Sequence, residues 1–195
     1  MSLESKIEPA KNSHSSFRQT AWEWTKVIVV ALIISAVVRS FVAEPFIVQG
    51  ASMDPTFSTN QFLIVDRISY RFGNPERGDV IVFAYPGDTR IDYIKRIIGL
   101  PGETIKIKEG VVSITNAAHP EGFILNETYI APGHRSFDNM ETTLSSTQYF
   151  TMGDNRAESS DSRAWGPLDR KLIIGRPILR LLPLTVLPGE YHEQK

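Results

Sequence analysis

An apolar segment close to the N-terminus, AWEWTKVIVVALIISAVVRSFVAEPF at residues 21–46, is the feature that most constrains how this chain can fold. The charge-free centre of the segment, residues 27–38, is by itself too short to cross a bilayer. A run of that length is also typical of a buried helix or of the core of a signal peptide. The residues on either side of the centre therefore decide between these alternatives.

The flanking residues favour a membrane-spanning helix. Trp22 and Trp24 are suited to the level of the lipid headgroups. The long side chains of Lys26 and Arg39 can reach water from the two ends of the segment. Roughly 19 residues of helix extend about 28 Å, close to the thickness of a hydrocarbon core. We therefore predict a transmembrane anchor over residues 21–43.

A cleavable signal peptide fits this segment less well. Cleavage requires small residues at the last and third-from-last positions before the cut. Neither alanine that could end such a peptide fits, because Phe41 and Ile34 occupy the third-from-last positions. Basic residues are more numerous before the apolar centre than directly after it, which favours a cytoplasmic N-terminus. We expect residues 1–20 to be a cytoplasmic tail and the chain after the anchor to lie on the exported side.

The composition excludes several classes of chemistry. The 195 residues are 42% hydrophobic and 22% charged with a net charge of −1, so no basic field is available to attract nucleic acid. The chain has no cysteine and therefore forms neither disulfides nor thiolate-ligated sites. The four histidines show no spacing typical of metal ligands, and they are His14, His119, His134 and His192. We expect solvated loop histidines, no metal, no cofactor and no histidine base.

The chain beyond Pro45 has the pattern of β-strands. Short runs rich in Ile, Val, Phe and Tyr are bounded by Asn, Gly, Pro and Asp. The stretch TIKIKEGVVSIT alternates on both sides of Glu109-Gly110 and predicts a hairpin. Further strands are predicted in QFLIVDRISY, GDVIVFAYP, QYFTMGDN and KLIIGRPILRLL. The polar region of about residues 116–146 is expected to be a loop-rich excursion from the β core.

Ser52 lies in GASMDPTF, residues 50–57, between Gly50-Ala51 and the turn signal Asp54-Pro55. Taken alone, this setting favours a turn residue, although a serine becomes a nucleophile when a base is within reach. With histidine set aside, that base would be a lysine whose pKa is depressed by apolar surroundings. Lys95, in RIDYIKRIIGLPGE, lies in such a strand. Two interpretations remain open: Lys95 points inward and Arg96 outward, or both lie on a solvent-exposed face.

A third segment, MGDNRAESSDSRAWGP at residues 152–167, concentrates charged and hydrogen-bonding side chains in one loop. An ordinary surface loop can have this composition. The same density also suits a rigid scaffold that positions neighbouring catalytic groups.

The order of these segments resembles that of the bacterial type I signal peptidases, the membrane-anchored Ser/Lys endopeptidases. The resemblance rests on the anchor followed by SMDPT, GDVIVF, YIKRIIGLPGE and GDNRAESSDSR. It implies a serine endopeptidase, without a cofactor, that removes signal peptides from exported preproteins by cleaving after small residues in an A-x-A pattern. The implied fold is mainly β, with an N-terminal transmembrane helix followed by an antiparallel β catalytic domain that carries a smaller β-rich insertion.

The resemblance also implies domain boundaries. The catalytic β core comprises residues 44–102 and 147–187, and a small insertion subdomain of residues 103–146 separates the two parts. A C-terminal tail follows at residues 188–195.

The resemblance assigns roles to individual residues. Ser52 is the nucleophile, Lys95 is the general base, and Ser159 orients the lysine amine. The backbone N–H of Ser52 helps to hold the oxyanion, and Gly50 stands where some members carry a hydroxyl residue, so a second donor is not identified. Shallow pockets for small side chains are lined by Val48, Met53, Tyr93 and Ile94. Structural support comes from Asp161 with Arg163 as a charge-assisted pair, and in the same way from Asp154 and Arg156.

Two other functions stay open at this point. A self-cleaving Ser/Lys regulator shares the chemistry, although such proteins are soluble and often carry a DNA-binding region. An inactive, membrane-tethered β-domain would only bind signal segments. The expected partners are exported preproteins and the lipid bilayer, not nucleic acid. The expected location is the plasma membrane in a single pass, with a thylakoid-type membrane as the alternative.

Overall fold

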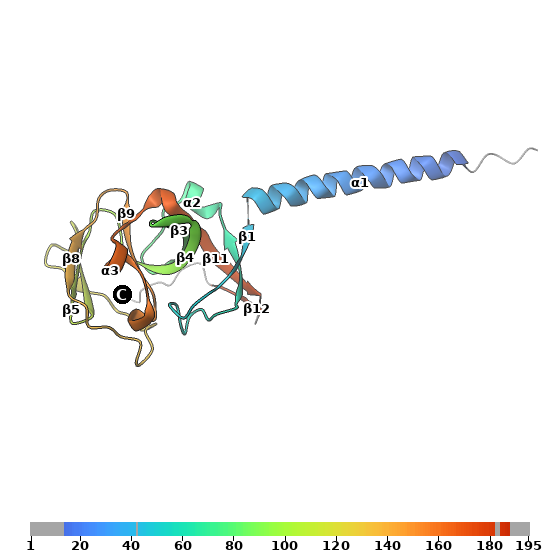
Figure 1. Cartoon of the computed structure of the whole chain (residues 1–195). Helices are drawn as coiled ribbons and strands as arrows, with labels where there is room; N and C mark the ends of the chain where they lie inside the picture. Colours follow the sequence, from blue (N-terminus) through green and yellow to red (C-terminus); the bar gives the residue numbers. More distant parts are fainter. Residues whose placement is uncertain (1–13, 42, 182–183, 188–195) are drawn as a thin grey trace, which may run out of the picture. The chain divides into compact units, whose positions relative to one another are not determined.

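The computed structural model describes residues 14–41, 43–181 and 184–187. The chain divides into two compact units, with the boundary after Ser40. Helix α1 (His14–Phe41) lies in the first unit except for its last residue, and it covers most of the predicted anchor (Figure 1). Among the described residues, no helix combines the length and the apolar character that crossing a membrane requires.

The second unit contains two antiparallel sheets (Figure 1). Over the described residues, the larger sheet has the strand order β1-β2-β11-β3-β4-β9-β10, with β12 paired to β11. Its strands are β1 (Ala43–Ile47), β2 (Phe62–Asp66), β3 (Val80–Tyr85), β4 (Asp88–Gly99), β9 (Gln148–Met152), β10 (Leu168–Asp169), β11 (Ile173–Leu181) and β12 (Leu184–Val186). Pro45 lies in β1, which stands at the end of the order, and edge strands are where proline is tolerated in a sheet. The mainly β prediction is therefore confirmed.

The smaller sheet is formed by the chain between β4 and β9. Within the described residues its order is β7-β6-β5-β8, and its strands are β5 (Thr104–Lys108), β6 (Val111–Thr115), β7 (Phe123–Ile124) and β8 (Met140–Thr143). The predicted hairpin joins β5 to β6. Glu109 and Gly110 adopt φ values of 52° and 79°, the left-handed conformations that a tight hairpin turn requires.

Short helices connect the strands of the larger sheet. They are α2 (Ser69–Phe72), the 3-10 turns η1 (Arg156–Glu158) and η2 (Arg170–Leu172), and α3 (Ser162–Trp165). The predicted strand in QFLIVDRISY is therefore shorter than expected. It ends at Asp66, whose side chain accepts hydrogen bonds from the backbone N–H groups of Ile68 and Ser69 and so starts a turn.

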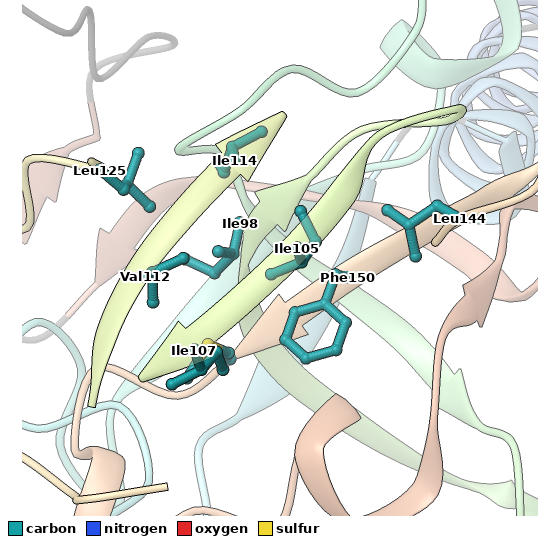
Figure 2. Packing of buried hydrophobic residues seen from close by; sticks show 9 residues of the cluster. Ile98, Ile105, Ile107, Val112, Ile114, Leu125, Leu144 and Phe150 are labelled. Atoms are coloured by element: carbon teal, nitrogen blue, oxygen red, sulfur yellow. The ribbon is translucent and has the colours of Figure 1, made fainter. Parts of the chain in front are cut away.

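One hydrophobic cluster joins the two sheets (Figure 2). Ile98 of β4 and Phe150 of β9 pack with residues of the smaller sheet such as Ile105 and Ile114, and all four are fully buried. The smaller sheet thus covers one face of β4 near the end of that strand. The opposite face packs in a second cluster through Ile97, together with Phe83 of β3.

Candidate active site

Ser52 lies in the loop that connects β1 to β2. The base of the loop is closed by the backbone hydrogen bonds from Val48 N to Gln61 O at 3.0 Å and from Asn60 N to Val48 O at 2.9 Å. The carbonyl oxygen of Ser52 accepts a hydrogen bond from the backbone N–H of Asn155 at 3.1 Å. The serine is therefore fixed both by its own loop and by the segment that follows β9.

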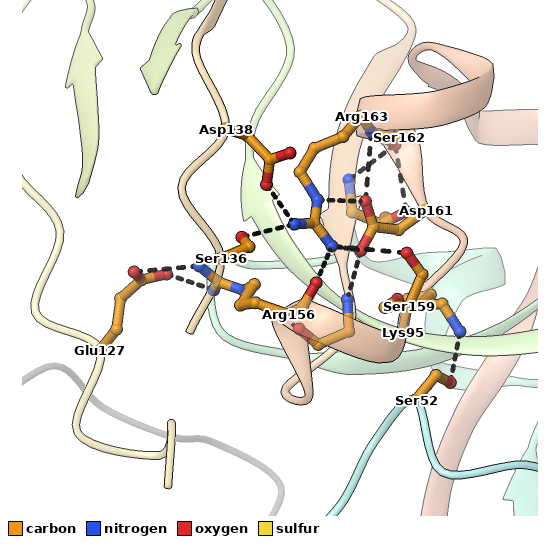
Figure 3. Close-up of polar contacts among 12 residues, drawn as sticks. Ser52, Lys95, Glu127, Ser136, Asp138, Arg156, Ser159, Asp161, Ser162 and Arg163 are labelled. Atoms are coloured by element: carbon orange, nitrogen blue, oxygen red, sulfur yellow. Dashed lines mark hydrogen bonds and ion pairs between the residues drawn. The ribbon is translucent and has the colours of Figure 1, made fainter. Parts of the chain in front are cut away.

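Lys95 projects from β4 toward this loop. Its Nζ lies 2.7 Å from Ser52 Oγ and donates to the carbonyl oxygen of Ile94 at 2.9 Å (Figure 3). The residue is only 3% exposed, and its amine lies 5.2 Å from the centre of the Tyr93 ring. Lys95 therefore points inward, as one of the two interpretations of this strand proposed for it.

The surroundings of Lys95 favour the neutral amine. Burial lowers the pKa of Lys95 to about 8, while the carboxylates of Asp161 and Asp154 act in the opposite direction. A lysine with an ordinary pKa of about 10.4 is almost fully protonated at neutral pH. At a pKa near 8 about a tenth of the amine is neutral at pH 7, and a neutral amine can accept the proton of an adjacent hydroxyl.

Gly153 allows the segment after β9 to approach the site closely. A Cβ atom on this residue would stand 2.4 Å from the carbonyl oxygen of Ser52 and 2.3 Å from Ser159 Oγ. Any side chain here would therefore displace the backbone that carries the serine. The close packing of the segment after β9 against Ser52 therefore requires glycine at position 153.

Ser159 follows the turn η1. Its hydroxyl oxygen is buried and has no hydrogen-bond partner among the residues that the structure describes. The close-up shows its side chain beside that of Lys95 (Figure 3). Lys95 Nζ donates to Ser52 Oγ and Ile94 O and, when protonated, has a third N–H. The orienting role of Ser159 stays a prediction.

Asp161 and Arg163 hold the loop that carries Ser159. Arg163 Nε and Nη2 donate to the two Asp161 oxygens at 2.8 and 2.7 Å, in a bidentate pair. Arg163 also donates to the carbonyl oxygen of Arg156 at 2.8 Å, and Asp161 accepts the backbone N–H of Gly153 at 3.0 Å. The charge-assisted pair expected from the sequence is therefore present, and it ties both ends of the loop together.

Arg96 does not point into solvent, which corrects the outward orientation expected for it. The residue is fully buried, and its Nε and Nη2 donate to the Asp154 carboxylate at 2.8 and 2.6 Å. Its guanidinium also lies 4.1 Å from the centre of the Tyr129 ring. Tyr129 belongs to the chain between β7 and β8. That chain covers the face of β4 that alternation had assigned to solvent.

The pairing of Asp154 with Arg96 also corrects the expected partnership of Asp154 and Arg156. Arg156 instead forms a buried pair with Glu127, and its Nε donates to the carbonyl oxygen of Gly153 at 3.0 Å (Figure 3). Removing one member of such a pair leaves an uncompensated charge in the interior. Both arginines therefore support the site through acidic partners that are distant in the sequence.

A cleft of about 590 Å³ opens beside Ser52 and Lys95. Three of the predicted pocket residues line it, namely Val48, Tyr93 and Ile94. Met53 does not, and its predicted place in the lining is wrong. Its side chain is fully buried in a cluster with Val48, Phe57 and Leu63. Further lining residues that sequence reasoning missed are Phe46, Leu63, Val82 and Asp92.

Gly50 adopts φ of 90°, in the left-handed region that favours glycine. Its carbonyl oxygen accepts a hydrogen bond from the Thr59 hydroxyl at 3.0 Å. A Cβ atom here would meet nothing within 4 Å, so backbone conformation rather than space explains the residue. A hydroxyl side chain at this position would carry the cost of that conformation.

Other polar groups near the site were not expected. His134 is half-buried rather than solvated, with Nδ1 3.2 Å from the carbonyl oxygen of Asp54. The contacts of Arg96, Glu127 and Thr56 were also not predicted, because their partners are remote in the sequence and no local spacing indicates them. Over the described part of the chain, no cluster of three or more His, Asp or Glu side chains could hold a metal ion.

Comparison with known proteins gives consistent matches. The profile of the family described as "Signal peptidase, peptidase S26" matches residues 21–182. The "Probable signal peptidase I-2" of Synechocystis sp. is 36% identical over 183 residues, which cover 91% of this chain and 80% of the relative. The "Signal peptidase I" of Bacillus licheniformis is 32% identical over 81% of this chain and 87% of the relative. A crystal structure of a signal peptidase I from Enterococcus faecalis V583 is 27% identical, with a TM-score of 0.45 over 53% of this chain and 97% of that one.

Proposed function

The chain belongs to the signal peptidase family, peptidase S26, and on that premise we propose that Ser52 and Lys95 are its catalytic dyad. It is a serine endopeptidase that removes signal peptides from preproteins. The observation that carries the assignment of the dyad is the distance of 2.7 Å between Lys95 Nζ and Ser52 Oγ at a buried lysine. Nucleophile and base within hydrogen-bond reach are the geometric requirement of this chemistry.

The reaction is acyl transfer. Neutral Lys95 takes the proton of the Ser52 hydroxyl while the oxygen attacks the scissile carbonyl carbon. The resulting ammonium gives its proton to the leaving amine. Lys95 then activates a water molecule that hydrolyses the acyl-enzyme and regenerates Ser52. The backbone N–H of Ser52 is the proposed donor to the oxyanion, with Ser159 orienting the lysine amine.

The cleft supports selection for small side chains. Val48, Tyr93 and Ile94 give it an apolar wall close to the dyad. A pocket of this kind discriminates mainly by excluding side chains that are too large. Substrates of the A-x-A pattern are therefore the proposed class, and the catalytic core of residues 44–102 and 147–187 is the proposed domain that binds them.

The proposed setting is a membrane surface on the exported side. The support is the sequence of residues 21–43, with Trp22 and Trp24 at one end of the apolar centre and a basic residue on each flank. Holding enzyme and preprotein at one surface raises their effective concentration without a new contact. Protease protection in sealed vesicles tests the orientation: the β unit must be digested only from the exported side.

Substitution of each dyad residue tests the assignment. Ser52→Ala and Lys95→Ala are each expected to abolish cleavage of an A-x-A preprotein, measured by mass spectrometry of the products. Ser113→Ala, in the smaller sheet, is the matched control. The two effects must be strongly non-additive because the residues act as one unit. If Lys95→Ala retained more than about a tenth of the rate, the lysine would lower the barrier by under ~1.4 kcal/mol, too little for a base.

A further inference from the structure

Thr56 is held at both its side chain and its backbone. Its Oγ1 donates to Asp154 Oδ2 at 2.5 Å, and its carbonyl oxygen accepts from Arg180 Nη2 at 2.5 Å. The Arg180 guanidinium in turn lies 5.1 Å from the centre of the Phe57 ring. Thr56 stands four residues after Ser52 in the same loop. A single hydroxyl therefore links the loop that carries the nucleophile to a buried carboxylate.

The carboxylate that accepts from Thr56 is that of Asp154, and it acts electrostatically on Lys95, the proposed base. Asp154 is fully buried and is gripped in a bidentate pair by Arg96, the residue that follows Lys95 on β4. Gly153, directly before it, packs against the backbone of Ser52. The Thr56 hydroxyl and the Arg96 guanidinium thus approach the same carboxylate, one from the nucleophile loop and one from the strand of the base.

We propose that Thr56 is a positioning residue of the Ser/Lys reaction, which locks the nucleophile loop to Asp154 and shares the negative charge of that carboxylate. The inference rests on the proposed function of Ser52 and Lys95 and adds a residue to it. The charged groups around the lysine amine are the carboxylates of Asp154 and Asp161, each paired to an arginine, Arg96 and Arg163 respectively. Thr56 supplies the neutral donor to the first of these pairs.

Removal of the hydroxyl has two expected effects. The loop loses a fixed link to the strand of the base, so productive alignment of Ser52 becomes rarer and kcat falls about ten-fold or more, with KM little changed. Asp154 also loses a donor, so its negative charge acts more strongly on Lys95 and favours the ammonium. The acidic limb of the kcat/KM profile is therefore expected to move to higher pH by about half a unit.

The experiment compares Thr56→Val and Thr56→Ser in the full chain with the same A-x-A preprotein. Valine keeps the shape and removes the hydroxyl, whereas serine keeps the hydroxyl and must restore both kcat and the position of the acidic limb. Thr104→Val is the matched control, because the hydroxyl of this half-buried threonine forms a hydrogen bond across the smaller sheet, to the hydroxyl of Thr143. If Thr56→Val does not fold, Thr56→Ala removes the hydroxyl without a branched side chain and is judged by the same criteria.

The outcomes separate this inference from the function on which it rests. A lower kcat with a shifted limb in Thr56→Val, and recovery in Thr56→Ser, supports it. Wild-type kinetics in Thr56→Val overturn it, and so does an equal loss at all pH values, which would indicate packing alone. Cleavage that survives Ser52→Ala would instead refute the dyad itself, whatever Thr56 does.

Discussion

The surroundings of Lys95 have opposite effects on its pKa. Burial disfavours its charge, while Asp161 and Asp154 favour it. The positive charge of Arg96, next to it in sequence, is compensated by the bidentate contact with Asp154. Desolvation is therefore the dominant cause of the low pKa of Lys95, the proposed base.

This balance predicts the pH dependence of catalysis. The base must be neutral, so activity must rise as pH increases through the pKa of Lys95, which lies near 8. The acidic limb of kcat/KM in the free enzyme is therefore expected with its midpoint close to pH 8. Steady-state kinetics on an A-x-A peptide between pH 6 and 10 provide the measurement. A profile that is flat over the acidic half of this range contradicts the assignment of Lys95.

The same balance predicts a stability cost. The pKa of Lys95 is lower in the folded chain than the ordinary value of about 10.4, so the folded state binds fewer protons between about pH 8 and 10.4. The cost is complete below about pH 8 and disappears as pH rises through that interval. Lys95→Met is expected to raise the free energy of unfolding by about 3 kcal/mol at pH 7 and to change little above pH 10.4.

Urea denaturation at several pH values measures this effect. Lys108→Met, which replaces an exposed lysine of β5, is the control and is expected to leave the pH dependence unchanged. A Lys95→Met protein that is less stable than the wild type at pH 7 would show that the lysine contributes more by its contacts than it costs by its burial.

At the scale of single elements, catalysis is expected to be sensitive to a side chain added at Gly153, in the segment after β9. Gly153→Ala is expected to reduce cleavage by at least about a hundred-fold, since a misplacement of about 1 Å in an active site can cost this much. The reason is the contact of the new methyl group with the Ser52 carbonyl oxygen and with Ser159 Oγ. Gly133→Ala shows the effect of backbone strain alone, because Gly133 has φ of 87° and an added Cβ would meet nothing within 4 Å.

Circular dichroism must accompany the Gly153→Ala kinetics. A folded enzyme with greatly reduced kcat is the expected combination. Wild-type activity would mean that the segment can move away without disturbing the dyad, which is incompatible with the tight packing of Gly153 described above.

β4 shows which parts of the structure can be predicted from sequence. Alternation along the strand allowed Lys95 to point inward but did not decide between that orientation and a solvent-exposed face. It failed for Arg96, because the face of Arg96 is covered by Tyr129, which lies 33 positions away. The pair of Arg156 with Glu127 was missed for the same reason. The motifs of the site could be found from local pattern and family resemblance, whereas the partners of its buried charges could not.

At the scale of the whole molecule, the two sheets of the β unit share one hydrophobic cluster. Ile98 and Phe150 of the larger sheet pack against Ile105 and Ile114 of the smaller one. The two sheets are therefore expected to unfold together in a single transition rather than as independent domains. Hydrogen exchange read by mass spectrometry tests this, with similar protection expected for peptides from β4 and β5.

Ile105→Ala sharpens that test. A loss of about 2–5 kcal/mol is expected for truncation of a fully buried isoleucine. The loss must appear in β4 and β9 as well as in the smaller sheet. Loss of protection confined to residues 104–143 would establish that the smaller sheet unfolds alone.

The place of β11 in the larger sheet has a consequence for biosynthesis. This strand comes late in the chain, yet it lies between β2 and β3, which are made much earlier. Neither of those strands can complete its hydrogen bonding until β11 has emerged from the ribosome. In the nascent chain the larger sheet consequently stays incomplete until β11 has been made. The order of its strands is therefore expected to delay the onset of proteolysis until β11 has been made.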